Sequence, residues 1–184
     1  MSMTYTQAIA ALSNPQYQTL EGLRTLVNQV SVAVPGAAPN ATTLLYSGLI
    51  NGAPSYLLAE SISATSSGKV ITINQTPAST FLNSADFRAA LMTAAGTEST
   101  NELKKLMDGV ANSNGTRING MWDIVSENLA KSATGDVRTL TAFAESGKTF
   151  AATELPALLS NSDVTHINGI PETKGSGLPF PKIM

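Results

Sequence analysis

Hydrophobic residues recur at helical spacing along several stretches of the chain, and polar residues fill the positions between them. In the first third, Leu20, Leu23, Val27 and Val30 fall on one helical face, with Leu26 beside them. This pattern predicts that the chain begins with helical structure, which a loop containing two prolines and Gly36 then ends.

Further helices are predicted in the middle of the chain from cap residues and apolar stripes. Ser84 can cap a helix that runs to about Ala95, and Ser99 with Glu102 has the spacing of a capping box. The apolar stripes of the two helices that follow are Leu103, Leu106, Met107 and Val110, and then Ile118, Met121, Trp122, Val125 and Leu129.

Short apolar or alternating runs predict strands at residues 42–46, 70–73, 136–143 and 164–167, with a helix from about Pro54 between the first two. Helices come first, and strands then alternate with helices. This order predicts an α/β (α+β) fold in which a helical N-terminal lobe packs on a small, mostly parallel sheet lobe.

The length of 184 residues suits a single domain, since domains of about 100–200 residues are common. We expect the helical lobe to use mainly residues 1–40 and 84–133. The sheet lobe is expected to use residues 42–73 and 134–170. Residues 171–184 are predicted to form a loose tail, because residues 175–184 contain two prolines and two glycines.

Composition excludes several functional classes. A net charge of −2 with only 13 % charged residues provides no basic surface for a nucleic-acid backbone. The chain has no cysteine and one histidine, His166, which excludes disulfides and zinc–thiolate sites. No signal peptide and no run of about 18 apolar residues is present, so no membrane segment is expected.

Local motifs give weak signals when each is taken alone. Residues 145–149 end like a phosphate-binding loop, but Ala142 stands where the required earlier glycine would be. His166 lies in a strand-like run, where a structural role is more common than a catalytic one. Trp122 and Ser126 lie one helical turn apart, facing either the core or a cleft. Glu154 either opens a helix or places a carboxylate at the mouth of a parallel sheet.

Four segments, in order, resemble the ADP-ribosyl cyclase / NAD glycohydrolase family. Leu44-Leu45-Tyr46-Ser47 is similar to that family's L-L-W-S, and residues 72–76 stand in the place of its T-L-E-D-T. Residues 122–126 are similar to W-x-x-V-S, and residues 149–154 match T-F-x-x-x-E. The resemblance extends roughly from Leu44 to Gly169 and suggests a bacterial-type, cysteine-free relative of the animal ectoenzymes.

The resemblance implies a role for each matching residue. The implied catalytic residues are Glu154, Trp122 and Ser126, and the implied substrate-binding residues are Tyr46, Ser47, Asn74, Gln75, Asn83, Thr149 and Phe150. The chain departs from the family where Asn74 and Gln75 replace an acidic pair, where Asn83 replaces a further acidic residue, and where Gly48 replaces an arginine. Phosphate binding therefore requires another donor.

The implied activity is cleavage of the nicotinamide–ribose bond of NAD, giving nicotinamide with ADP-ribose, cyclic ADP-ribose or both. NAD is then the substrate, and neither a cofactor nor a metal is expected. The absence of cysteine and of a signal peptide favours a toxin or effector domain that acts in a cytoplasm, its own or that of a target cell, with a neutralising immunity protein as partner. The alternatives are a non-catalytic nucleotide-binding module and a structural domain.

Overall fold

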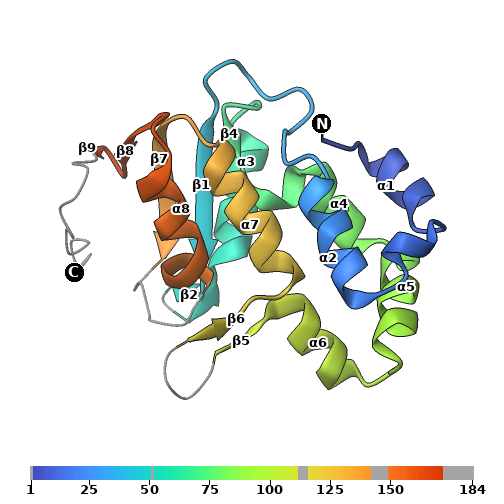
Figure 1. Cartoon of the computed structure of the whole chain (residues 1–184). Helices are drawn as coiled ribbons and strands as arrows, with labels where there is room; N and C mark the ends of the chain where they lie inside the picture. Colours follow the sequence, from blue (N-terminus) through green and yellow to red (C-terminus); the bar gives the residue numbers. More distant parts are fainter. Residues whose placement is uncertain (1, 51, 112–115, 142–148, 172–184) are drawn as a thin grey trace.

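The computed structural model describes residues 2–50, 52–111, 116–141 and 149–171, and for residues 170 and 171 only the backbone. Helices and strands alternate along most of the chain (Figure 1). The helices are α1 (Tyr5–Ala11), α2 (Leu20–Gln29), α3 (Ser55–Thr65), α4 (Pro77–Asn83), α5 (Ala85–Ala95), α6 (Thr100–Asp108), α7 (Met121–Ser132) and α8 (Leu155–Ser160). Short turns of 3-10 helix lie at η1 (Pro15–Tyr17) and η2 (Ile73–Gln75), and η3 (Phe150–Glu154) is a π-helical turn.

The described residues form a five-stranded sheet with strand order β4-β1-β7-β8-β9. Its strands are β1 (Thr42–Ser47), β4 (Val70–Ile71), β7 (Gly135–Thr141), β8 (Val164–Ile167) and β9 (Ile170–Pro171). Neighbouring strands are parallel except for the β8–β9 pair, so the expectation of a mixed fold with a mostly parallel sheet is confirmed. Two small antiparallel pairs are separate: β2 (Leu49–Ile50) with β3 (Ala53–Pro54), and β5 (Val110–Ala111) with β6 (Arg117–Ile118).

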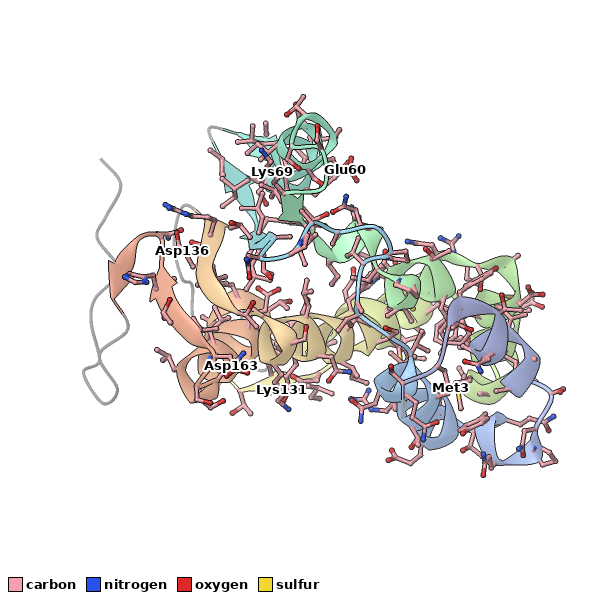
Figure 2. The ribbon with its side chains drawn as sticks, turned by 90° about the horizontal axis from the view of Figure 1, so that it is seen from above. Met3, Glu60, Lys69, Lys131, Asp136 and Asp163 are labelled. Atoms are coloured by element: carbon pink, nitrogen blue, oxygen red, sulfur yellow. The ribbon has the colours of Figure 1, made fainter. Side chains whose placement is uncertain are left out.

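Helices cover both faces of this sheet. Figure 2 looks down on the molecule, with Glu60 of α3 on one side of the sheet and Lys131 of α7 on the other. The helix α8 lies beside α7 on that second side (Figure 1). The carboxyl ends of β1 and β7 therefore open between α3 and α7.

Two hydrophobic clusters form the core, and α7 contributes to both. Met121 and Val125, near its start, pack with buried residues of α1, α2, α4 and α5. Leu129 and Ala130, one turn later, pack with the sheet and α8. The predicted division of the chain into two lobes stays a prediction, because this one helix spans both clusters.

Several elements lie where the sequence pattern placed them. The helix at 20–29 buries Leu23, Leu26 and Val27, as its stripe predicted. The hydroxyl group of Ser84 accepts a hydrogen bond from the Phe87 N–H at 3.1 Å, so Ser84 caps α5 as expected. The predicted strands at 42–46 and 164–167 are confirmed as β1 and β8.

Other predictions of local structure were wrong. Ser99 precedes α6 but makes no side-chain cap hydrogen bond. The Ser99 N–H donates to the Thr97 hydroxyl group at 3.1 Å, and the Glu102 carboxylate pairs with Lys105 at 2.7 Å, so the capping box does not form. Val110 and Ile118 were predicted on helices, yet they face each other in the β5–β6 pair.

The strand predicted at residues 70–73 ends at Ile71, and a helix that was not predicted follows. Gln75 accepts a hydrogen bond from the Thr72 N–H and forms a turn. Thr76 then caps α4 by accepting a hydrogen bond from the Ser79 N–H, and Pro77 takes the first helical position.

Some predictions fall outside the described residues: the turn at 112–115, the end of the strand at Phe143, most of the loop motif at 145–149, and all but the first residue of the tail at 171–184. Within the described part of the chain, every helix is too short or too polar to cross a lipid bilayer.

Candidate active site

An open pocket of about 1110 Å³ lies at the carboxyl end of β1. Ligands of parallel α/β folds commonly bind at this end of the strands. Elements from both sides of the sheet meet around it, and its lining residues are Leu44, Leu45, Tyr46, Ser47, Gly48, Ser55, Tyr56, Glu60, Ile73, Asn74, Ser79, Asn83, Lys104, Asp108, Trp122, Ser126, Thr149 and Glu154.

Glu154 contributes a buried carboxyl group to this pocket. The side chain is only 4 % exposed, and no hydrogen-bond partner among the described residues reaches its Oε2 atom. Glu154 ends the π-helical turn, in which the Leu155 N–H donates to the Phe150 carbonyl five residues earlier. Pro156 follows and has no N–H to give the ordinary α-helical bond, which favours the wider turn at this place.

The helix α7 lines the pocket with an aromatic ring and a hydroxyl group. Trp122 and Ser126 are four residues apart, so both lie on the helical face toward the pocket. The Ser126 hydroxyl group, 5 % exposed, hydrogen-bonds to the Glu154 carboxyl group. The indole ring of Trp122 is half-buried and packs partly against the first hydrophobic cluster.

Burial raises the pKa of Glu154 to about 8, with Ser126 opposing the shift and the negative charge of Asp123 adding to it. The carboxyl group is therefore mostly protonated at neutral pH while the pocket is empty. The pKa of Tyr46 also lies above its ordinary range, because of burial and then the charges of Glu60 and Glu154. These shifts mark a low-dielectric region at the base of the pocket, as is common at functional sites.

Polar groups from other elements surround this base. Ser47 and Gly48 follow Tyr46 at the end of β1, and Gly48 has a φ of +72°, which favours glycine. Opposite them, the Asn74 side-chain amide donates a hydrogen bond to Glu60 of α3 at 2.7 Å.

Most of the residues predicted for the site line this pocket. They are Tyr46, Ser47, Asn74, Asn83, Trp122, Ser126, Thr149 and Glu154. The structure thus brings these side chains together, and their roles toward a substrate stay predictions.

Two predicted residues do not line the pocket. Gln75 is exposed, and its side-chain oxygen accepts the Thr72 N–H at 2.8 Å. Phe150 is 1 % exposed and packs in the second hydrophobic cluster, so its ring supports the turn that carries Glu154. His166 also lies away from the pocket, in β8, with Nδ1 3.0 Å from the Thr165 hydroxyl group.

Four lining residues on α3 and α6 were not predicted from the sequence. Tyr56 and Glu60 lie one turn apart on α3, and Lys104 and Asp108 lie one turn apart on α6 and form an ion pair. The four-residue spacing in each pair can be recognised in the sequence, but no local sequence pattern indicates that the two helices face the same pocket. Among the described residues, no three side chains of the metal-binding types gather in one place.

Comparison with known proteins gives little support for assigning the chain to a family. No protein-family model matches the chain, and no curated protein matches it. Among solved structures, the chain is similar to an Aplysia cyclase whose crystal structure is described as complexed with the substrate NGD and the product cGDPR. The identity is 18 % and the TM-score is 0.43, with 85 % of this chain and 57 % of that chain covered. This is a distant likeness of fold, and the chain spans little more than half the length of that protein.

Proposed function

We propose that this protein cleaves the bond between nicotinamide and ribose in NAD. The observation that carries the proposal is the buried carboxyl group of Glu154, which has an unpartnered oxygen, beside the Ser126 hydroxyl group and the Trp122 ring. The proposal also rests on the ordered resemblance of four sequence segments to the ADP-ribosyl cyclase / NAD glycohydrolase family.

A single carboxylate suffices for this reaction. The nicotinamide ring of NAD carries a positive charge and leaves as a neutral molecule, so no general acid is required to protonate it. Positive charge moves to the ribose ring in the transition state, as it does in glycoside hydrolysis. The Glu154 carboxylate then stabilises that charge in a water-poor setting, where such an interaction is strong.

The raised pKa of Glu154, about 8 in the empty pocket, fits a cationic substrate. A nearby positive charge favours the ionised form of a carboxyl group. When the cationic nicotinamide ring enters, Glu154 loses its proton, and the resulting carboxylate faces the reacting ribose. The Ser126 hydroxyl group donates to that carboxylate and holds it in place.

The rest of the pocket suits the flat rings and the phosphates of NAD. Trp122 and Tyr46 provide aromatic faces, and stacking of this kind contributes about 0.5–1.5 kcal/mol per pair beyond the buried area. Ser47 and Thr149 provide hydroxyl donors for the pyrophosphate. Capture of the ribose by water gives ADP-ribose, whereas capture by the adenine ring gives cyclic ADP-ribose.

The test compares the wild type with Glu154→Gln during incubation with NAD, with nicotinamide, ADP-ribose and cyclic ADP-ribose separated by chromatography. Glu127→Gln is the matched control, because Glu127 lies on α7 next to Ser126 but pairs with Lys131 and does not line this pocket. We expect nicotinamide release by the wild type and the control and none by Glu154→Gln. Equal release by Glu154→Gln would contradict the proposed site.

A non-catalytic nucleotide-binding module is the second candidate. The replacement of an acidic pair by Asn74 and Gln75 favours it, because Asn74 is bonded to Glu60 and Gln75 caps a turn. Calorimetry that shows NAD binding without nicotinamide release would support this candidate. A structural domain, the third alternative, predicts no NAD binding.

We further propose that NAD depletion in a target cell is the biological use, with a neutralising immunity protein as partner. Production of the wild type in bacterial cells is expected to lower their NAD content, and production of Glu154→Gln is not. An unchanged NAD content in cells that produce an active wild type would contradict this use.

A further inference from the structure

An ion pair on the helix α6 brings a positive charge to the pocket. Among the described residues that line the pocket, Lys104 is the one with a positive charge, whereas Glu60, Asp108 and Glu154 carry carboxyl groups. Lys104 lies one helical turn before Asp108 and forms an ion pair with it. An anion that enters the pocket therefore meets an ammonium group that a neighbouring carboxylate holds.

The Lys104–Asp108 pair can open easily. The two side chains are 72 % and 45 % exposed. An exposed pair of this kind contributes little to stability, because water screens the attraction and ordering two side chains costs entropy. A pyrophosphate offers the ammonium group two negative charges and several acceptor oxygens, whereas Asp108 offers one charge. A pyrophosphate in the pocket can therefore draw the ammonium group away from Asp108.

The backbone that carries this pair is held in place, beside the start of α7 (Figure 1). The Asp108 carbonyl group accepts a hydrogen bond from the Arg117 guanidinium group. Apolar side chains of α6 also pack against the first hydrophobic cluster, as does Trp122, and they are Leu103, Leu106 and Met107. The exposed side chain of Lys104 can thus change partner while its backbone keeps its place at the pocket.

The next residue, Lys105, differs from Lys104 in the feature that matters here. Lys105 also forms an exposed ion pair within α6, with Glu102 at 2.7 Å, and these two side chains are 56 % and 55 % exposed. Lys105 does not line the pocket, however. The two lysines therefore match in helix, charge and type of pairing, and they differ in access to the pocket.

We propose that Lys104 binds the pyrophosphate of the substrate and that Asp108 holds its ammonium group while the pocket is empty. The hydroxyl groups of Ser47 and Thr149 line the same pocket and are neutral donors. Lys104 adds the positive charge that two phosphate groups require in a pocket with several carboxyl groups. The identity of the ligand rests on the proposed function.

The test measures binding of ADP-ribose, which contains the pyrophosphate and has no bond to nicotinamide that could be cleaved. The fluorescence of Trp122 reports binding, because this residue lines the pocket and is the only tryptophan in the chain. Titrations compare the wild type with Lys104→Gln, with Lys104→Arg, which keeps the charge, and with Asp108→Asn. Lys105→Gln is the matched control.

We expect Lys104→Gln to weaken ADP-ribose binding about tenfold or more, since a hydrogen bond between two charged groups is lost. Lys104→Arg is expected to keep most of the affinity, and Lys105→Gln all of it. Asp108→Asn is expected to tighten binding, because the competing carboxylate is removed. Added salt is expected to weaken binding by the wild type more than binding by Lys104→Gln.

Two results would overturn the proposal. One is equal affinity of the wild type and Lys104→Gln for ADP-ribose. The other is an equal loss of affinity in Lys104→Gln and Lys105→Gln, which would show a general effect of charge on α6. In NAD cleavage, Lys104→Gln is expected to raise KM about tenfold and to leave kcat nearly unchanged, because the pyrophosphate contact is the same before and during bond cleavage. An unchanged KM would also count against the proposal.

This proposal and the proposed function fail separately. ADP-ribose binding that depends on Lys104, without NAD cleavage by the wild type, would support the role of Lys104 and overturn the proposed function. NAD cleavage that depends on Glu154, with a KM that does not depend on Lys104, would do the reverse. A wild type that neither binds ADP-ribose nor cleaves NAD would overturn both.

Discussion

The pocket has two walls that are built in opposite ways. The first, formed by α7 and η3 and here called the buried wall, hides its reactive groups: Ser126 is 5 % exposed and Glu154 is 4 % exposed. The second, formed by α3 and here called the α3 wall, hides small residues and exposes large ones. On α3 the buried side chains are Ser55, Ala59 and Ser63, and the large exposed ones are Tyr56, Leu57 and Leu58.

The difference shows how each wall is held. The buried wall is held by apolar packing, since α7 contributes to both hydrophobic clusters. The α3 wall is held by close approach to the sheet, where Ala59 is fully buried and the Ser63 hydroxyl group donates to the Val70 carbonyl at 3.1 Å. Chemistry that requires a fixed geometry and a low dielectric belongs on the first wall.

The largest expected effect is on the pH dependence of stability, and it comes from the Glu154 carboxyl group in the buried wall. The pKa of Glu154 rises from 4.5 to about 8 on folding, so the folded protein binds one more proton than the unfolded chain between these pH values. Stability therefore decreases as the pH rises from about 4.5 to about 8, by about 5 kcal/mol for this group. Urea unfolding of the wild type and of Glu154→Gln at several pH values measures this decrease in the free energy of unfolding. Parallel pH dependences of the two proteins would contradict this account.

A core substitution on the same wall has the next largest effect. Leu129 on α7 is 1 % exposed and packs in the second cluster, so Leu129→Ala is expected to lower the free energy of unfolding by about 2–5 kcal/mol. Urea unfolding at a single pH measures the change. A loss below about 1 kcal/mol would show that the cluster closes around the cavity and that the wall is less rigid than its packing indicates.

Removal of the Ser126 hydroxyl group tests whether this group of the buried wall acts on the Glu154 carboxyl group. The hydrogen bond from Ser126 lowers the pKa of Glu154, so Ser126→Ala is expected to raise that pKa above its value of about 8. Since hydrogen bonds to charged groups contribute about 1.5–3 kcal/mol, the rate of NAD cleavage is expected to fall at least about tenfold. The measurement is the pH profile of nicotinamide release, and Ser132→Ala at the end of α7, outside the pocket, is the control.

The smallest effect is expected on the α3 wall. Leu57 is 51 % exposed and does not line the pocket, so Leu57→Ala is expected to change the free energy of unfolding by less than about 0.5 kcal/mol. NAD cleavage is expected to continue at the wild-type rate. A large loss of stability measured by urea unfolding would show that the exposed side chains of α3 support the fold and that the contrast between the walls is false.

Sequence patterns predicted the buried wall better than the α3 wall. The apolar stripe of α7 and the spacing of Trp122, Ser126 and Glu154 follow from helical periodicity and from the family resemblance. On α3 that logic fails, because the residues that pack are the small ones and Tyr56 and Glu60 face the pocket. Helical periodicity predicts that the large apolar residues of a helix face the core, whereas on α3 the small residues are buried and the large apolar residues are exposed.

Contacts between distant parts of the chain could not be predicted from the sequence. The helix α4 was not predicted, although Thr76 and Pro77, which follow the predicted strand at residues 70–73, are typical of a helix start. Phe150 was expected at the substrate because its motif places it near Glu154, and its ring points into the core instead. The buried ion pair between Arg117 and Asp123 depends on the contact between the end of α6 and the start of α7, which no local pattern shows.

Because Phe150–Glu154 form a π-helical turn, the position of Glu154 in the pocket depends more on the number of residues in this turn than on which residues they are. Each residue of an α-helix advances the side-chain direction by about 100°. Removing one residue between Phe150 and Glu154 would restore ordinary helical winding and change the direction of Phe150 relative to Glu154 by about that angle. The Phe150 ring in the second hydrophobic cluster and the Glu154 carboxyl group in the pocket could then not both keep their positions. A family of related sequences would have to conserve the number of residues here even where it varied their kind.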